Sequence, residues 1–549
     1  MQGLMMDYPL TLQHAFNRAV RIFPRKEVVT QTDNGLHRYT YRDWGKRTLQ
    51  LANALRSAGV QEGDRIATFG WNTYRHLELY FAVPCMGAVL HTLNIRLFAD
   101  QLVYIINNAE DKIIFVDGDL VPLLESLADQ LTSVKQYVIM GEAPGATGKL
   151  QPAIDYEAFI AGQPESYDWP QLDENAAAAM CYTSGTTGNP KGVLYSHRSI
   201  FLHSMAVGLT DGPGLGEHDV VLPIVPMFHA NAWGLPHAAV MFGSKVVLPG
   251  RFLDPLSLAH LMAQEHVTHT GAVPTIWIGI LHVLEKEQVD LSALHTIICG
   301  GSAVPRALIE GLHRKGLNII QGWGMTETSP LASLGKLRSY QEALPLAEQF
   351  AIKAKQGTVM PGVDFRVMNL ETGLEVPWDN QSYGELQVRG PWVARMYYGD
   401  SEPGEKFADG WLRTGDVAVV DEEGMIQLVD RTKDVVKSGG EWISSVELEN
   451  LIMSHPKVLE ACVIGLPHPK WDERPYAYVV AKPDFVGQIT KDEIFDHLRP
   501  QIAKWWLPED VIFIDAIPKT SVGKFDKKVL RSKYGTYSTS QRGSSYGSV

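Results

Sequence analysis

The sequence lacks long apolar runs, has few cysteines and carries fewer basic than acidic residues. No uninterrupted apolar stretch approaches the roughly 20 residues that a membrane-spanning helix needs, although 45% of the 549 residues are hydrophobic. The start of the chain, M-Q-G-L-M-M-D-Y-P-L, contains an acid and no basic residue, so no secretory signal is evident. We therefore expect a globular protein of the cytoplasm with no transmembrane segment.

The shortage of positive charge argues against nucleic acid as a partner. The chain has 49 Lys and Arg against 62 Asp and Glu, a formal net charge of −13. Broad binding to nucleic acid or to anionic membranes relies on clustered Lys and Arg that neutralise phosphates. A polyanionic small substrate must therefore meet positive charge that is concentrated locally.

The cysteines are too scattered to form a disulfide framework or a zinc set. They are Cys85, Cys181, Cys299 and Cys462. All four lie in apolar contexts, which is typical of reduced core residues. Two histidine pairs have a spacing compatible with a metal, His266 with His269 and His229 with His237. Neither pair forms a recognisable ligand set with carboxylates or cysteines, so we predict no metal site there.

Helical and strand patterns alternate twice along the chain, from Leu10 to about Met140 and from Asp219 to Gln321. Such alternation is typical of βαβ units with a mostly parallel sheet. Five strands are expected in the second alternation: Val220 to Val225, Lys245 to Leu248, Thr268 to Gly271, Thr296 to Cys299 and Asn318 to Gln321. We predict an α/β fold with two doubly wound subdomains.

The character of the sequence changes after the second alternation. Residues 331–356 are expected to be helical, and a small β-rich subdomain follows and ends near Asp416. The charged run D-R-T-K-D places a domain boundary, so that residues 1–430 form the large domain and 431–533 a small α+β domain. Residues 534–549 are rich in Ser, Gly and Tyr, and we expect them to be disordered.

The segment from Tyr182 to Gly192, Y-T-S-G-T-T-G-N-P-K-G, has the composition of a phosphate-binding loop. Its glycines permit positive φ and turn successive N–H groups toward one anion, its hydroxyls add donors, and Lys191 adds a cation. An ordinary Gly/Ser/Thr turn is the alternative. A Walker A loop is excluded, because that motif needs Gly at Pro190 and Ser or Thr at Gly192. The candidate phosphate ligands are Thr183, Ser184, Gly185, Thr186, Thr187 and Gly188.

Three further segments follow expected strands. Ligands of doubly wound folds bind where such strands end. In M-F-H-A-N-A-W, His229 and Trp233 would share one face of a helix; the alternative is a core aromatic residue beside a capping histidine. The other two segments run from Gly300 to Ala303 and from Gly322 to Glu327, and a structural turn is the alternative there. Their glycines would admit a flat base, Trp323 would offer a stacking face, and Thr326 and Glu327 offer oxygen ligands for Mg²⁺.

Taken together, these segments resemble the adenylate-forming enzymes over nearly the whole chain. Five segments are similar to the fatty acyl-CoA synthetase branch in particular: V-P-M-F-H-A-N-A-W, G-W-G-M-T-E-T-S-P, R-T-G-D, D-R-T-K-D-V-V-K-S-G-G-E-W-I-S and T-S-V-G-K. That branch includes medium- and long-chain fatty acid–CoA ligases and methylmercaptopropionate–CoA ligase. The resemblance implies that a carboxylic acid is activated by ATP and Mg²⁺ as an acyl-adenylate and then transferred to coenzyme A. It also implies a homodimer and a mobile C-terminal domain.

The resemblance assigns roles to individual residues. The implied catalytic residues are Lys524, Glu327, Lys191 and His229, with Glu327 and Thr186 as Mg²⁺ ligands. Adenine and its neighbourhood would contact Gly301, Ser302, Ala303, Gly322, Trp323, Gly324, Met325 and Thr326. Asp416, a carboxylate at a turn, would bind the ribose with Arg431, and Gly439 and Gly440 would serve the thiol step. The acyl pocket would be lined by His229, Trp233 and Gly301, and Lys433 would be the hinge. From composition alone, Lys524 is an ordinary surface lysine.

Two alternatives to a short- or medium-chain fatty acid–CoA ligase remain. One is another adenylate-forming activator, of aryl or amino acids, and the other is a nucleotide-binding regulator without catalysis. The presence of the whole set Lys191, Glu327, Asp416, Arg431 and Lys524 argues against the regulator.

Overall fold

The fold was analysed in a computed structural model. It describes residues 1, 3–141, 148–183, 189–438, 441–520 and 525–534. Two compact units are present. The first comprises residues 1–304, 308–365 and 388–413, and the second comprises residues 305–307, 366–387 and 414–549.

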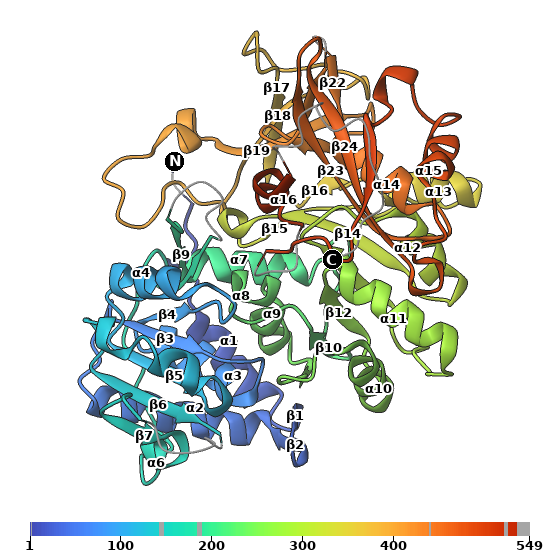
Figure 1. The fold of residues 1–549 in the computed structure, drawn as a ribbon. Helices are drawn as coiled ribbons and strands as arrows, with labels where there is room; N and C mark the ends of the chain where they lie inside the picture. Colours follow the sequence, from blue (N-terminus) through green and yellow to red (C-terminus); the bar gives the residue numbers. More distant parts are fainter. Residues whose placement is uncertain (2, 142–147, 184–188, 439–440, 521–524, 535–549) are drawn as a thin grey trace. The chain divides into compact units, whose positions relative to one another are not determined.

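The first unit contains a seven-stranded sheet in the order β7-β6-β5-β3-β4-β8-β9 (Figure 1). Its strands are β3 (Arg65–Phe69), β4 (Val89–Thr92), β5 (Ile113–Asp117), β6 (Gln136–Met140), β7 (Ala153–Asp155), β8 (Ala177–Tyr182) and β9 (Gly192–Ser196). All neighbours are parallel except β8 and β9, which form an antiparallel pair. This confirms the predicted parallel α/β half.

A nine-stranded sheet in the order β16-β15-β14-β13-β12-β10-β11-β1-β2 forms the rest of this unit's strand framework. Its strands are β10 (Val220–Pro223), β11 (Lys245–Leu248), β12 (His269–Ala272), β13 (Thr296–Gly300), β14 (Ile319–Gly324), β15 (Leu331–Leu334), β16 (Thr358–Val359), β1 (Glu27–Thr32) and β2 (Gly35–Thr40). The central strands, which follow the spatial order β14-β13-β12-β10-β11-β1, are all parallel to their neighbours. All five strands predicted here are confirmed, each within a few residues at its ends.

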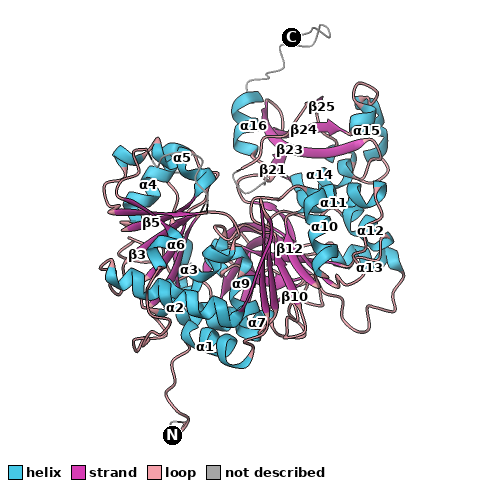
Figure 2. Ribbon diagram, turned by 90° about the horizontal axis from the view of Figure 1, so that it is seen from below, coloured by secondary structure: helices cyan, strands magenta, loops and turns pink. Residues whose placement is uncertain are grey.

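Helices cover both faces of the two sheets (Figure 2). The inner helices are α1 (Leu12–Ile22), α2 (Tyr41–Ser57), α3 (Tyr74–Cys85), α6 (Tyr156–Ile160), α7 (His197–Val207) and α9 (Leu235–Phe242). The outer ones are α4 (Ala99–Ala109) and α5 (Val121–Glu125) on the first sheet, and α10 (Pro255–Glu265), α11 (Pro274–Lys286) and α12 (Arg306–Arg314) on the second. The largest apolar cluster joins the inner helices to residues of both sheets, such as Ile66 and Val246. Their neighbours Ala67 and Val247 enter the two outer clusters, as the alternation of side chains along a strand requires.

One expectation was wrong in detail. Residues 331–356 are not one helix: β15 pairs with β14 and β16, and only α13 (Leu346–Lys353) is helical. The short apolar run L-A-S-L cannot be distinguished from a buried helical segment by pattern alone. In addition, β1 and β2 lie before the first sheet in the chain but join the second, where Val28 of β1 is paired with Val246 of β11. Local patterns carry no information on such distant pairing.

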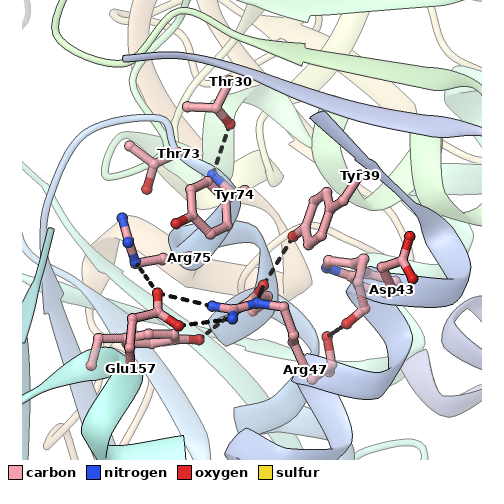
Figure 3. A network of polar contacts seen from close by, with 12 residues as sticks. Thr30, Tyr39, Asp43, Arg47, Thr73, Tyr74, Arg75 and Glu157 are labelled. Carbon is pink, nitrogen blue, oxygen red and sulfur yellow. Dashed lines mark hydrogen bonds and ion pairs between the residues drawn. The ribbon is translucent and has the colours of Figure 1, made fainter. Parts of the chain in front are cut away.

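A polar network ties α2, α3 and α6 together beside β2 (Figure 3). The guanidinium of Arg47 lies 2.7 Å from the carboxylate of Glu78 and 2.8 Å from that of Glu157, and Arg75 lies 2.9 Å from Glu157. The hydroxyl of Tyr39 donates to Glu78 at 3.0 Å. Burial raises the pKa of Glu78, and Arg47 opposes that rise. Glu78 is therefore a buried acid that depends on one cation.

The second unit is built on two sheets, which agrees with the predicted β-rich and α+β segments. One has the order β17-β18-β19-β20 and the other β22-β21-β24-β23, with β25 beside β24. The strands are β17 (Asp364–Met368), β18 (Gly384–Arg389), β19 (Leu412–Val420), β20 (Ile426–Arg431), β21 (Val436–Ser438), β22 (Glu441–Ile443), β23 (Val458–His468), β24 (Asp472–Ala481) and β25 (Asp510–Phe513). The helices are α14 (Ser445–Met453), α15 (Lys491–Leu498) and α16 (Lys527–Tyr534). The division into residues 1–430, 431–533 and 534–549 stays a prediction.

Within the described residues, no helix is both long enough and apolar enough to cross a membrane. The four cysteines are free thiols and all are buried, as predicted.

Candidate active site

The predicted phosphate loop connects β8 to β9. The paired ends of these strands form the neck of the loop. Tyr182 and Gly192 are paired across the two strands. Beyond them, the N–H of Thr183 donates to the carbonyl of Lys191 at 2.9 Å, and the N–H of Lys191 donates to the hydroxyl of Thr183 at 3.2 Å. The side chain of Lys191 is exposed at this neck. Five of the predicted phosphate ligands lie outside the described residues: Ser184, Gly185, Thr186, Thr187 and Gly188.

Gly192 is tightly packed at the base of the loop. A Cβ atom there would lie 3.1 Å from the ring of Tyr182 and 3.1 Å from the side chain of Tyr398. Its carbonyl accepts a hydrogen bond from the N–H of Tyr398 at 2.8 Å. The base of the loop is therefore held by a residue more than 200 positions later in the chain, near the end of the first unit.

The segment after β10, where a helix was expected, forms a left-handed turn. The short element α8 (Ala230–Trp233) has four consecutive residues with φ between 43° and 57°, and Gly234 follows at φ 74°. Left-handed backbone costs roughly 1–2 kcal/mol for each residue with a side chain, so neighbouring groups must hold it. The thiol of Cys181 donates to the side-chain oxygen of Asn231 at 3.4 Å. The helix expected at this segment is therefore a single left-handed turn that begins after His229, and the shared face of His229 and Trp233 stays a prediction.

The chain leading into this turn is clamped by polar side chains from elements near the first sheet. The amide group of Asn72 donates to the carbonyls of Pro223 and Val225, at 2.8 and 2.9 Å, and accepts from the N–H of Met227 at 2.7 Å. The hydroxyl of Tyr80 donates to the carbonyl of Met227. Buried hydrogen bonds of this kind fix a strained segment because breaking them leaves unpaired polar groups.

Trp233 lies over the carboxyl ends of two strands. A Cβ atom added to Gly271 would lie 3.4 Å from the indole, and one added to Gly300 would lie 3.6 Å from it. Trp233 and His229 are both half-buried. The indole thus packs on bare backbone at the edge of the sheet where ligands of such folds bind. Its predicted contact with the acid stays a prediction.

The glycines at the carboxyl ends of β13 and β14 allow backbone segments to pack closely against each other. A Cβ atom at Gly300 would lie 2.4 Å from the carbonyl oxygen of Gly322, and one at Gly324 would lie 1.7 Å from that of Pro330. Gly301 has φ +85°, which favours glycine. Trp323 is only 7% exposed, so little of its indole is open for stacking. The other residues that were predicted to contact adenine differ in exposure. Ser302 is exposed, Ala303 and Met325 are half-buried, and Thr326 is buried.

Glu327 is a buried carboxylate with a cation against it. It lies in the short helix η3 (Thr326–Thr328) and is 2% exposed. The ammonium of Lys406, in η4 (Glu405–Gly410), lies 2.9 Å from its Oε1, and the hydroxyl of Tyr397 donates to the same oxygen. Burial, and then Glu327, raise the pKa of Tyr397. Lys406 and Tyr397 were not predicted from the sequence, because they are 79 and 70 positions away and no local motif marks them.

The backbone of η3 is held from both sides. The hydroxyl of Tyr195, in β9, donates to the carbonyl of Thr326 at 2.8 Å. The N–H of Ala394 donates to the carbonyl of Glu327 at 2.7 Å. Strand β9 therefore supports both the phosphate loop and the carboxylate, so two predicted parts of the site share one rigid element.

In the second unit, Asp416 and Arg431 face each other across two antiparallel strands. The two residues are paired in the register of β19 and β20, and the guanidinium lies 3.2 Å from the carboxylate. Asp416 was expected at a turn, which is wrong: it lies in the middle of β19, after Gly415 at φ +76°. A strand position orients the carboxylate more firmly than a turn does.

Lys433 lies in the connection between β20 and β21, where the chain passes from one sheet to the next. It is exposed, whereas both flanking acids are anchored: Asp430 accepts from the N–H of Ser445 at 2.7 Å, and Asp434 pairs with Arg531 at 2.7 Å. The hinge role of Lys433 stays a prediction. Gly439, Gly440 and Lys524 lie outside the described residues.

Comparisons with known proteins match the chain over almost its whole length. The family model described as AMP-binding enzyme matches residues 16–398, and that of the AMP-binding enzyme C-terminal domain matches residues 447–524. A long-chain-fatty-acid–CoA ligase of Thermus thermophilus is 48% identical, covering 97% of both chains. A medium-chain-fatty-acid–CoA ligase of Ectopseudomonas oleovorans is 41% identical, covering 97% of this chain and 98% of its own. The crystal structure of an anthranilate CoA ligase with anthranoyl-AMP gives a TM-score of 0.86 at 25% identity, over 96% of this chain and 98% of that one.

Proposed function

This chain belongs to the AMP-binding enzyme family, and from that premise we propose that it joins a fatty acid to coenzyme A at the expense of ATP. The observation that carries the proposal is the 48% identity to a fatty-acid–CoA ligase over 97% of both chains. ATP and coenzyme A are then substrates, and neither step needs a covalent bond to the protein. We also propose a homodimer that resides in the cytoplasm.

The first step forms a mixed anhydride. A carboxylate oxygen of the acid attacks the α-phosphorus of ATP, and pyrophosphate leaves. Two anions approach each other, so the site must supply cations and oriented N–H donors. In the second step the thiol of coenzyme A attacks the acyl carbon, loses its proton, and AMP leaves.

Lys191 is the proposed cation for the phosphates of ATP. Its ammonium group is exposed directly beside the neck of the Gly-rich loop, and the neck fixes the backbone on both sides of that loop. His229, at the start of the strained turn, is proposed to orient the carboxylate of the acid. Lys524 is proposed to balance the charge that develops in the first step, by the resemblance of T-S-V-G-K to the family motif.

The oxygen donors at Glu327 fit Mg²⁺. The carboxylate is buried, and the fold already accommodates the positive charge of Lys406 at 2.9 Å. Mg²⁺ prefers few protein carboxylates because it shares phosphate oxygens. We propose Glu327 and Thr186 as its ligands. When bound, Mg²⁺ neutralises charge on the phosphates.

Asp416 is proposed to accept hydrogen bonds from the two ribose hydroxyls. Its carboxylate is oriented by β19, and Arg431 lies beside it at 3.2 Å. A guanidinium is also a good partner for phosphate oxygens. Gly439 and Gly440 are proposed to serve the thiol step.

The test is turnover with a panel of acids. ATP, Mg²⁺ and straight-chain acids of increasing length are mixed with the protein, with and without coenzyme A, and acyl-CoA, AMP and pyrophosphate are quantified. We expect the three products in equal amounts, with acyl-CoA only when coenzyme A is present. Lys191→Met should lower the rate by about 100-fold or more, whereas Lys135→Met, a matched exposed lysine before β6, should leave it unchanged. Pyrophosphate release without thioester would point to another kind of activator, and binding of ATP without turnover would overturn the proposal.

A further inference from the structure

A second cluster of possible metal-ligand atoms lies at the amino ends of strands in the nine-stranded sheet, on the side away from the candidate active site. Asp219 directly precedes β10, His269 begins β12 and His295 directly precedes β13. These strands are parallel neighbours in the order β13-β12-β10, so the three side chains gather at their amino ends. The candidate active site lies at the carboxyl ends. Strands of four or five residues are roughly 13–17 Å long, which separates the two sites.

The distances suit a tetrahedral metal ion. The Nδ1 of His269 lies 3.1 Å and the Nε2 of His295 lies 3.5 Å from the carboxylate oxygen Oδ1 of Asp219. All three ligand atoms lie within 4.8 Å of one another. Zinc with bonds of 2.0–2.1 Å places tetrahedral ligand atoms roughly 3.3 Å apart. Two of the three separations are therefore already close to those of a bound site.

The hydrogen bonding of His269 leaves a place for a cation. Its Nε2 faces the carbonyl of Pro213 at 3.3 Å, and its Nδ1 faces the carboxylate of Asp219. A neutral imidazole has one N–H, so it cannot donate to both acceptors. The hydroxyl of Thr268 donates to Asp219 at 2.9 Å and lies 3.0 Å from the Nδ1 of His269. With the imidazole neutral, a metal ion at Nδ1 leaves the single N–H on Nε2 for the carbonyl of Pro213 and takes the place of a proton between His269 and Asp219.

The outer contacts and the exposure of the cluster also resemble those of metal sites. Metal-bound histidines usually engage the second ring nitrogen with a carbonyl or another polar group. Here the Nε2 of His269 faces Pro213, and the Nδ1 of His295 lies 3.2 Å from the hydroxyl of Thr296. The side chain of His269 is 3% exposed, that of Asp219 12% and that of His295 60%, so an ion can enter from the solvent.

We infer that Asp219, His269 and His295 bind one zinc-class divalent cation, with water as the fourth ligand, and that the ion fastens the amino ends of three strands. The sequence predicted no metal site at His266 and His269, because the pair forms no recognisable ligand set with carboxylates or cysteines. His266 is exposed at the end of α10, and the carboxylate comes instead from Asp219, 50 positions earlier in the chain. This inference is independent of the proposed ligase activity.

The test measures metal binding directly. Full-length protein without an affinity tag is freed of metal with a chelator and titrated with zinc by calorimetry, and bound metal is counted by mass spectrometry. We expect one equivalent of zinc, a melting temperature raised by several degrees, and the visible absorption bands of tetrahedral cobalt(II) when cobalt replaces zinc.

Two variants separate this site from weak binding elsewhere. His295→Ala should weaken zinc binding at least tenfold and abolish the tetrahedral cobalt bands. His260→Ala is the matched control, because His260 is 58% exposed and lies 3.5 Å from Glu287, but among the described residues no second imidazole joins that pair. The His260→Ala protein should bind zinc as the wild type does. Asp219→Asn should repeat the loss. Absence of stoichiometric zinc in the wild type, or equal affinity of His295→Ala and His260→Ala, would show that the cluster is only an imidazolium–carboxylate pair.

Discussion

Trp233 is the residue that we expect to set the length of the acid. Its indole packs on Gly271 and Gly300 at the carboxyl edge of the sheet, and a strained turn holds it there. Each buried methylene is worth about 0.8 kcal/mol, or roughly fourfold in kcat/KM, until the pocket is full. We predict a cutoff at short to medium chains. Trp233→Ala should move the cutoff to longer acids, and Trp233→Phe should move it less.

The measurement is kcat/KM over a homologous series of straight-chain acids for all three proteins. The same profile in each would show that Trp233 only packs and that other residues limit the depth of the pocket. A wild type that prefers long chains would contradict the predicted length.

Lys406 and Glu327 should have opposite effects on the need for Mg²⁺. The ammonium of Lys406 lies 2.9 Å from Oε1 of Glu327, so it would compete with a metal ion for this carboxylate. Removing this competitor in Lys406→Met should lower the Mg²⁺ concentration for half-maximal pyrophosphate release several-fold. Glu327→Gln removes the ligand charge and should raise that concentration and lower the rate by about 100-fold. Direct titration of Mg²⁺ into the protein with a non-hydrolysable ATP analogue gives a second readout. A shift in the same direction in both variants would exclude Glu327 as a metal ligand.

At the scale of elements, Arg47 should be the main support of the junction of α2, α3 and α6. Arg47→Met leaves Glu78, whose side chain is fully buried, without its cation. Breaking such a pair costs about 3–5 kcal/mol. The control is Arg75→Met, whose partner Glu157 is 44% exposed, so a loss of about 1 kcal/mol or less is expected.

Denaturant unfolding of Arg47→Met with and without Glu78→Gln measures this effect. The added substitution removes the unpaired buried charge but keeps an acceptor for Tyr39, so it should restore part of the stability. If the double variant is as unstable as Arg47→Met, lost packing of the arginine stem explains the loss instead.

For the whole molecule, we predict that the C-terminal domain takes two orientations about Lys433. Lys524 and the Gly439-Gly440 segment are assigned to successive steps, and one orientation cannot serve both. Lys433→Pro fixes φ near −65° and restricts the rotation. We expect one half-reaction to survive and the other to fall by at least tenfold. Pyrophosphate formation and the conversion of synthetic acyl-adenylate with coenzyme A measure the steps separately, and equal loss or full retention of both would refute the hinge.

The sequence predicted the fold better than the detailed site. Strands such as β11 and β13 were found because buried parallel strands leave short apolar runs between turn residues. The pairing of β1 with β11, the left-handed turn before Trp233 and the contact of Lys406 with Glu327 were not found, because each depends on groups distant in the chain. Distant contacts also placed Asp416 in a strand and gave His269 its carboxylate.

The fate of a carboxylate oxygen tests the central claim most directly. A fatty acid whose carboxylate carries heavy oxygen is incubated with the protein, ATP, Mg²⁺ and coenzyme A, and the products are examined by mass spectrometry. If the carboxylate attacks the α-phosphorus and the thiol then displaces AMP, one labelled oxygen must appear in the phosphate of AMP. Label in inorganic phosphate together with ADP, or unlabelled AMP beside labelled acyl-CoA, would contradict an acyl-adenylate intermediate.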